Sequence, residues 1–201
     1  MVLKSRYHSD NKLLEAGLDE AGRGCLAGPV VAAAVVLPEN FNNAMVNDSK
    51  KLNHQKRMEI RELIFKDALT YGIGVVWNEK IDEINILNAT YLAMHKALDK
   101  LKPVPEFLLI DGNRFKSYKQ IKYQCIIKGD GLYFSIAAAS ILAKTERDLI
   151  MHDIHKEFPD FKWNQNKGYP TKDHKKSIAE NGITKYHRKS FNLNPQLSLD
   201  F

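Results

Sequence analysis

The amino-acid sequence predicts an α/β fold in which helices flank a mixed sheet and a helical part follows at the C-terminus. Three strand-like runs come early in the chain, which favours an antiparallel meander. Helical and strand-like patterns then alternate, as they do where helices pack on a sheet. No stretch rich in Pro, Gly or Ser divides the 201 residues. We therefore expect one domain, residues 1–201, with a helical portion at about 160–201.

Five segments have the composition of β-strands. The first, Leu14 to Asp19, is short and ends beside two carboxylates. The run Pro29 to Leu37 consists mainly of Val and Ala without polar alternation, which indicates a strand buried on both faces. Tyr71 to Trp77 completes the expected meander. Later in the chain, Glu106 to Asp111 and Lys122 to Lys128 have the same character.

Four segments are typical of helices. Asn53 is placed to cap a helix that runs to about Ala68. Apolar residues from Ile84 to Leu101 recur at spacings of three and four, which predicts an amphipathic helix that stops before Pro103. A long helix is expected from Ser135 to about Phe158, and a last one from Thr171 to Gly182.

The composition excludes several classes of protein. The longest uncharged apolar run has 11 residues, Ala27 to Leu37, whereas a membrane-spanning helix needs about 20. No apolar stretch opens the chain, so we expect no signal peptide. The two cysteines, Cys25 and Cys125, form no CxxC pair, which argues against a zinc ribbon and favours a reducing cytoplasm. Lys and Arg outnumber Asp and Glu by 30 to 24, a balance compatible with a polyanionic partner.

Four carboxylates lie at or just past the ends of predicted strands: Asp19, Glu20, Asp111 and Asp130. Neighbouring carboxylates repel each other, so that one is protonated or a cation neutralises the group. Hard divalent cations such as Mg²⁺ prefer oxygen ligands, and two of them can clamp the attacking and leaving oxygens of a phosphodiester. Taken singly, each acid has a plainer interpretation as a solvated turn residue or a helix cap, and Asp130 in particular as an N-cap.

The acid pair runs directly into the loop Gly22-Arg23-Gly24. Glycines let backbone N–H groups approach an anion closely, and an arginine adds a forked phosphate donor. The loop matches neither of the common nucleotide-binding fingerprints. Its alternative interpretation is a tight hairpin that carries an exposed arginine.

These residues, followed by Gly28-Pro29-Val30, resemble the signature of the ribonuclease HII family. The resemblance continues in family order from about Leu14 to Phe191. It passes through Asp48-Ser49-Lys50-Lys51-Leu52, Ile110-Asp111-Gly112, Lys128-Gly129-Asp130, Ala138 to Lys144 with Arg147-Asp148, Gly168-Tyr169-Pro170-Thr171 with His174, and His187 to Phe191.

The resemblance implies a ribonuclease H-like mixed sheet whose C-terminal helical portion binds substrate. It implies an endoribonuclease that hydrolyses the RNA strand of RNA/DNA hybrids. It also implies nicking of a DNA duplex on the 5′ side of a single embedded ribonucleotide, leaving 5′-phosphate and 3′-hydroxyl ends. Two divalent cations, Mn²⁺ or Mg²⁺, are the implied cofactors.

Carried over by motif, Asp19, Glu20, Asp111 and Asp130 are the implied catalytic, metal-binding acids. The Gly22-Arg23-Gly24 loop is implied to grip the ribonucleotide and its 2′-hydroxyl, the group that distinguishes RNA from DNA. Tyr169 is implied to stack on the sugar of the next nucleotide. The related ribonuclease HIII usually carries Gly-Lys-Gly in place of this loop. A mild departure is Cys25, for which we expect the behaviour of a small buried apolar residue.

Several basic residues are candidates for phosphate contacts. Lys50 and Lys51 precede a predicted helix, and their alternative is a solvated loop. Lys144 and Arg147 lie about one helical turn apart and could line one groove, whereas Asp148 is better explained as an ion-pair partner. His187 and Arg188 either touch nucleic acid or hold the C-terminal helices in place.

Partners and competing functions complete the expectations. RNA/DNA hybrid and DNA duplex with an embedded ribonucleotide are the expected substrates of a monomer, with no membrane. The tail Asn194 to Phe201 carries a Gln, two Leu and a terminal Phe, which makes a sliding clamp a candidate partner; a frayed terminus is the alternative. The competing functions are another carboxylate-metal nuclease on the same fold and a non-catalytic nucleic-acid binder. The arginine loop argues against the first, and four acids in a binding cleft argue against the second.

Overall fold

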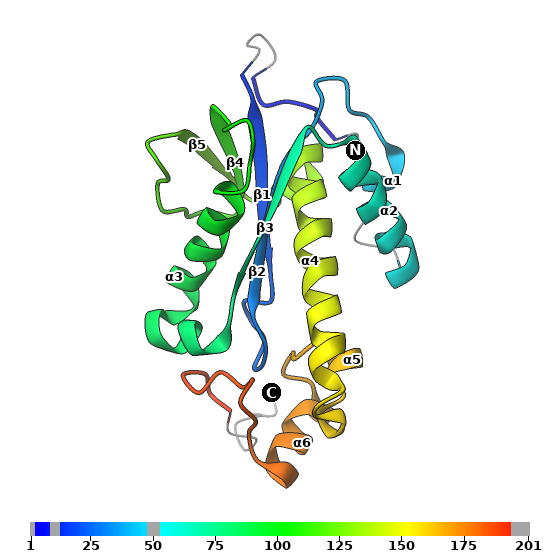
Figure 1. Ribbon diagram of the computed structural model, residues 1–201, viewed down its shortest axis with the longest axis vertical. Coiled ribbons are helices and arrows are strands. Elements are labelled where there is room, and N and C mark those ends of the chain that lie inside the picture. The colour runs from blue at the N-terminus through cyan, green and yellow to red at the C-terminus, as the bar shows by residue number, and fades with distance from the viewer. Residues whose placement is uncertain (1–2, 9–12, 48–52, 194–201) are drawn as a thin grey trace.

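The structure, a computed structural model, describes residues 3–8, 13–47 and 53–193 (Figure 1). One mixed sheet has the strand order β3-β2-β1-β4-β5. The first three strands pair antiparallel, which confirms the meander, and β1, β4 and β5 run parallel. The strands are β1 (Glu15–Ala21), β2 (Val30–Val36), β3 (Thr70–Val76), β4 (Phe107–Asp111) and β5 (Lys122–Ile126).

Helices cover both faces of this sheet. The long helices α3 (Asn78–Leu98) and α4 (Phe134–His155) pack against opposite faces, and α2 (His54–Asp67) packs outside α4 (Figure 1). The shorter helices are α1 (Ala44–Asn47), α5 (Trp163–Asn166) and α6 (Lys172–Asn181). None of the helices in the described ranges is both long and apolar enough to cross a bilayer.

The central strand β2 is buried along its whole length, as its Val and Ala content predicted. Ala32 and Ala34 belong to the apolar cluster under α3, whereas Ala33 and Val35 belong to the cluster under α4. Successive side chains of a strand point to opposite faces, so a strand between two helical layers needs apolar residues at every position. The two helical layers therefore hold in place the sheet on which the candidate site lies.

Small residues let α3 approach the sheet closely. A Cβ atom added to Gly72 would lie 2.1 Å from the Ala97 carbonyl oxygen, and one added to Gly74 would lie 2.0 Å from that of Ala93. Neither separation is sterically allowed, so β3 and α3 pack backbone against backbone only because both positions are glycine.

Two predicted caps are confirmed, and several boundaries differ. Asn53 accepts a hydrogen bond from the Lys56 N–H, and Thr171 accepts one from the His174 N–H. The segment Asn78–Leu98 consists of two helical pieces that meet at Asn85, whose φ of 65° and ψ of 164° are not helical. The amphipathic helix predicted from Ile84 is the second piece, and a polar first piece without apolar periodicity precedes it. The long helix predicted to reach Phe158 ends at His155, and the strand predicted to reach Lys128 ends at Ile126.

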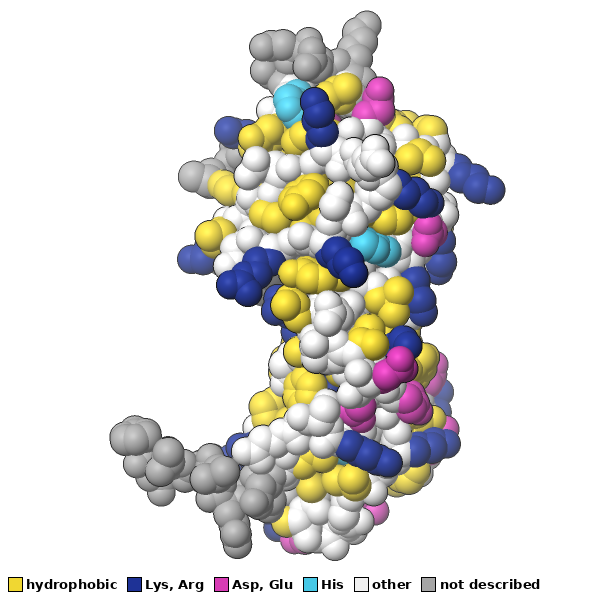
Figure 2. Space-filling view, turned by 90° about the vertical axis from the view of Figure 1, so that its left-hand side faces the viewer, with side chains coloured by type: hydrophobic (Ala, Val, Ile, Leu, Met, Phe, Trp, Pro, Cys, Tyr) yellow, Lys and Arg dark blue, Asp and Glu magenta, His cyan; other side chains and the backbone are white. Residues whose placement is uncertain are grey.

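The C-terminal helical part packs against the end of α4. Trp163, Phe161 and Ile178 form an apolar cluster with Met151 of α4 and with Ala27, which precedes β2. In the space-filling view the molecule narrows between the larger part that holds the sheet and this smaller part (Figure 2). The Gly-Arg-Gly segment lies between β1 and β2, at the end of the sheet that faces the smaller part.

Candidate active site

Strands β1 and β4 bring two of the predicted acids together. The last residues that these parallel strands pair are Leu18 and Ile110. Asp19 and Asp111 follow directly, so both lie one step beyond the end of the parallel ladder. The sequence had predicted that Asp19 ends its strand. Instead, β1 continues to Ala21, because it goes on pairing with β2.

Asp130 lies in a short 3-10 turn, Gly129–Gly131, between β5 and α4. The Gly129 N–H donates a 2.7 Å hydrogen bond to Oδ1 of Asp111, which ties this turn to the β4 acid. The N-cap residue of α4 is Tyr133, so Asp130 is not the cap that its plainer interpretation required. The turn therefore carries the fourth acid to the same end of the sheet.

Burial and mutual repulsion perturb the acids. Asp19 is 7% exposed, and burial raises its pKa well above the ordinary aspartate value. The nearby charges of Glu20 and Asp111 raise it further, against a hydrogen bond from Ser140. Burial also raises the pKa of Glu20, which the Arg23 guanidinium at 3.1 Å opposes. Acids held together at such a cost are typical of functional sites.

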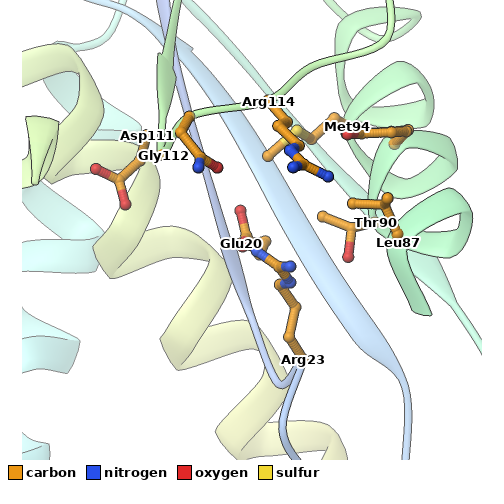
Figure 3. A pocket seen from close by; sticks show the side chains of 10 residues that line it. Glu20, Arg23, Leu87, Thr90, Met94, Asp111, Gly112 and Arg114 are labelled. Carbon is orange, nitrogen blue, oxygen red and sulfur yellow. Dashed lines mark hydrogen bonds and ion pairs between the residues drawn. The ribbon is translucent and has the colours of Figure 1, made fainter. Parts of the chain in front are cut away.

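The chemistry of these acids fits hard divalent cations, which take carboxylate oxygens and relieve repulsion between them. As the side chains stand, no three His, Cys, Asp or Glu residues in the described ranges already surround a common point that could hold an ion. The physical reason is that the carboxylates have other partners: Asp111 accepts from Gly129, and Glu20 pairs with Arg23 (Figure 3).

The Gly-Arg-Gly loop needs its first glycine. Gly22 has φ +93°, and a Cβ atom there would lie 2.0 Å from Nε of Arg147. Arg23, by contrast, projects from the loop with a side chain that is 52% exposed. The alternative interpretation, a tight hairpin with an exposed arginine, is thus correct about the exposure of Arg23. The loop is, however, also locked in shape by side chains buried beneath it.

Arg188 provides much of that lock. Its fully buried guanidinium donates to four main-chain oxygens: Gly22 at 2.7 Å, Arg23 at 2.9 Å, Gly28 at 3.1 Å and Pro29 at 3.2 Å. Buried carbonyls need such donors. Two roles were predicted for Arg188, contact with nucleic acid or support of the fold. These hydrogen bonds favour support of the fold.

Arg147 is also structural, so the prediction that it lines a groove beside Lys144 is wrong. It is 2% exposed and donates to the carbonyl oxygens of Ala27, Pro29 and Lys167 at 2.8–3.1 Å. A helix places residues three apart at different angles around its axis. Arg147 consequently points beneath the loop while Lys144 lies at the surface of the site.

His187 is buried beside His174 in the C-terminal part. Its Nε2 lies 3.3 Å from Nε2 of His174, which accepts a hydrogen bond from the Trp163 indole, and its Nδ1 accepts from the Thr184 N–H. Burial lowers the pKa of His187 to about 4. The imidazole is therefore neutral at pH 7 and holds the chain next to Arg188.

Tyr169 lies beside the loop with its ring 43% exposed. It hydrogen-bonds Cys25, and the Arg147 guanidinium lies 5.9 Å from its ring centroid. Cys25 is fully buried, as predicted, and both cysteines are free. A cavity of about 280 Å³ is lined by Tyr169 together with Glu20, Ala21, Gly22, Arg23, Gly24, Ser140 and Lys144.

Lys144 pairs with Asp148 at 3.7 Å across one turn of α4, which confirms the ion-pair role predicted for Asp148. Lys50 and Lys51 lie outside the described residues, as does the tail 194–201, so those expectations stay predictions.

Sequence reasoning missed some residues around the acids. Ser140 hydrogen-bonds Asp19, although the sequence assigned it no role within its motif. On the other side of Glu20, a cavity of about 270 Å³ extends to Thr90 of α3 and to Asn113 and Arg114, which follow β4 (Figure 3). Arg114 lies three residues beyond Asp111, and this proximity was its one sequence signal.

Comparison with known proteins agrees with this geometry. A family model described as ribonuclease HII matches residues 16–194. Ribonuclease HII of Christiangramia forsetii is 61% identical over 96% of this chain and 98% of its own length. That of Bacteroides thetaiotaomicron is 59% identical over 94% of this chain and 96% of its own length.

Solved structures share the fold. The PCNA:RNase HII complex from Archaeoglobus fulgidus matches with a TM-score of 0.74 at 28% identity, over 89% of this chain and 95% of that one. Bst-RNase HIII in complex with Mn²⁺ matches with a TM-score of 0.68 at 20% identity, over 92% of this chain and 69% of that one. The mixed sheet, the paired acids, the family model and the curated relatives lead to one conclusion. The chain belongs to the ribonuclease HII family and is a ribonuclease H, an endonuclease that hydrolyses RNA in RNA/DNA hybrids.

Proposed function

We propose that Asp19, Glu20, Asp111 and Asp130 are the catalytic acids and together hold two divalent cations, Mn²⁺ or Mg²⁺. Bound cations supply Lewis-acid stabilisation of the charge that develops on the phosphodiester, and they lower the pKa of water. The raised pKa of Asp19 and its repulsion from Glu20 and Asp111 support this role, because a cation offsets both. Among the solved relatives, a ribonuclease HIII was crystallised with Mn²⁺.

The neighbouring residues would select the substrate. The Gly22-Arg23-Gly24 loop offers main-chain groups at the wall of the same cavity as Glu20, close enough to test for a 2′-hydroxyl. Tyr169 presents an exposed ring to the next sugar, and Lys144 presents an ammonium group to a phosphate. Lys50 and Lys51 are expected to add phosphate contacts, and residues about 160–201 to form the substrate-binding portion.

The enzyme would thereby also nick a DNA duplex on the 5′ side of one embedded ribonucleotide, leaving 5′-phosphate and 3′-hydroxyl ends. The observation that carries this proposal is the shared cavity of Glu20, the Gly-Arg-Gly loop and Tyr169. A nucleotide bound in this cavity would contact both the sugar-sensing loop and an acid.

The test is cleavage of an end-labelled DNA duplex that contains one ribonucleotide, with Mn²⁺, with Mg²⁺ and with EDTA. An all-DNA duplex and a long RNA/DNA hybrid are the controls. We expect a metal-dependent nick 5′ of the ribonucleotide and none in all-DNA. Cleavage of the hybrid alone would overturn the single-ribonucleotide proposal.

A sliding clamp stays a predicted partner of the tail 194–201, a monomer the predicted state and the cytoplasm the predicted location. The Archaeoglobus relative was solved with PCNA, which is the precedent for the first. Gel filtration of the full chain and of a chain ending at residue 193, each with and without clamp, tests partner and state together.

A further inference from the structure

A third cavity, of about 520 Å³, shares no lining residue with the two cavities beside the candidate catalytic acids. It lies between α2, the second half of α4 and the end of α5, and both α2 and α5 pack against α4 (Figure 1). We call it the α2–α4–α5 cavity. The polar residues that line it are His54, Arg57, Asp148, His152, Asn164 and Lys167.

Positive charge dominates this cavity. Arg57 and Lys167 are the basic residues of its lining, which also includes the imidazoles of His54 and His152. Asp148 is the one acid among the lining residues, and it already pairs with Lys144. Burial and the charges of Lys144, Arg147 and Arg57 lower the pKa of Lys167, although Asp148 opposes them. Basic residues therefore outnumber acidic ones in the lining of the cavity, which favours an anionic ligand.

Lys167 is held in position before any ligand arrives. Its Nζ donates to the Asn164 carbonyl oxygen at 2.6 Å, and its own carbonyl oxygen accepts from Arg147 at 2.8 Å. The side-chain Oδ1 of Asn164 is buried without a hydrogen-bond partner among the described residues. Rotation of the amide would present its NH₂ group to an anion instead. A preorganised cation loses little entropy on binding.

The α2–α4–α5 cavity and the candidate active site both lie along α4, one after the other. Four polar residues of this helix follow one another at intervals of four: Ser140, Lys144, Asp148 and His152. The first hydrogen-bonds Asp19 and, with the second, lines the active-site cavity, whereas the last two line the α2–α4–α5 cavity. Eight residues of helix separate Ser140 from Asp148, which corresponds to about 12 Å. From the other side, the segment from Lys167 to Tyr169 connects the two cavities.

We propose that the α2–α4–α5 cavity binds a backbone phosphate of the substrate duplex, beyond the nucleotide that lies against Tyr169. The ligand class is a phosphodiester monoanion, held by Arg57 and Lys167. The inference rests on the proposed function, since the position of the duplex follows from the catalytic acids and Tyr169. It adds an anchor on DNA that flanks the cleaved bond.

The test uses the full chain with Arg57→Gln, with Lys167→Gln and with both, since glutamine keeps most of the aliphatic stem. Lys66→Gln is the matched control: it removes an exposed charge from the last turn of the same helix α2. The KM, the kcat and the salt dependence of binding are measured on a single-ribonucleotide duplex with long DNA arms. Unchanged circular dichroism and thermal midpoint show that each variant is folded.

We expect each cavity variant to raise KM about tenfold, the cost of one charged hydrogen bond, with kcat nearly unchanged. The slope of log affinity against log salt should fall by about 1. On duplexes whose DNA arm is shortened stepwise, the difference between wild type and variant should vanish at one arm length. A wild-type KM and slope in the double variant, or a loss that is the same at every arm length, would overturn the proposal.

Two further arms separate the alternatives. Inorganic phosphate titrated against wild type should compete only weakly with the long duplex; tight phosphate binding at Arg57 and Lys167 without any effect of arm length would assign the cavity to a free anion. If wild type fails to nick the duplex, the proposed function fails. The cavity is then tested alone, by the salt slope of duplex binding to Asp19→Asn with and without the cavity substitutions.

Discussion

The Arg188 guanidinium donates a 2.7 Å hydrogen bond to the main-chain oxygen of Gly22, 166 residues earlier in the chain. Three more carbonyls of the same loop region accept from this one side chain. An arginine from the C-terminal part thus supports the shape of the loop beside the proposed catalytic acids. The exposed surface of the loop, which we propose faces the substrate, therefore depends on a side chain buried beneath it.

Replacement of Arg188 by lysine should therefore impair recognition of the ribonucleotide. A lysine has three donors on one nitrogen and cannot serve four separate carbonyls. We expect KM for the single-ribonucleotide duplex to rise about tenfold, since each buried carbonyl left unpaired costs about 1–3 kcal/mol. Steady-state kinetics checks this, with the exposed neighbour Lys189→Ala as control. A loss confined to kcat, with KM unchanged, would contradict the positioning role.

Asp19→Asn should abolish turnover while leaving duplex binding largely intact. The loss should exceed the about 100-fold that removal of one electrostatic contact costs in other active sites. Cleavage rates and fluorescence anisotropy of the uncleaved complex measure the two effects. Asp153→Asn, a 70% exposed position on α4, is the control. Near-full activity of Asp19→Asn would remove this residue from the catalytic acids.

The same substitution should stabilise the protein when EDTA removes metal. Burial raises the pKa of Asp19, so its ionised form opposes folding, and this penalty grows as pH rises above the ordinary pKa of an aspartate. Asparagine carries no charge and avoids it. At pH 8 we expect the melting temperature of Asp19→Asn to exceed that of wild type by at least about 2 °C, the shift that about 1 kcal/mol of unfolding free energy produces in a protein of this length. At pH 4 we expect no such difference. Equal melting temperatures at pH 8 would refute the electrostatic argument.

His187 should contribute to acid lability. Its pKa is about 4 in the folded protein against 6.5 when unperturbed, because burial disfavours the charged form. Between these values the unfolded chain binds a proton that the folded chain excludes, so unfolding free energy falls as pH falls through this window. The slope is at most about 1.4 kcal/mol per pH unit for one group. Urea titrations at several pH values measure it. His187→Asn should flatten the slope, whereas the exposed His152→Asn should not.

Tyr169→Ala should impair cleavage at a single embedded ribonucleotide more than cleavage of a long hybrid. In the proposed function the ring contacts the sugar next to the ribonucleotide, and a long hybrid offers the enzyme many equivalent positions. The ratio of kcat/KM on the two substrates should change by about tenfold, the value of 1.4 kcal/mol. Tyr123→Ala on β5, also 40% exposed, is the control. Equal losses on both substrates would remove the junction-sensing role.

Local patterns in the sequence determined much of the fold. The unbroken Val and Ala run of β2 predicted burial on both faces, and Asn53 and Thr171 predicted two helix starts. These succeed because the residues that indicate a strand buried on both faces, or that cap a helix, lie close together in the chain. The order of motifs likewise indicated the family to which the chain belongs.

Only the tertiary structure decided the roles of the basic residues. Lys144 and Arg147 are three residues apart and both basic, yet one lies at the active-site cavity and the other beneath the Gly22 loop. Arg188 likewise serves carbonyls rather than phosphates. The sequence by itself determined that positive charge and paired acids are present. Which partner each charge meets depends on packing between segments more than 100 residues apart, because a buried guanidinium binds whichever acceptors the fold closes around it.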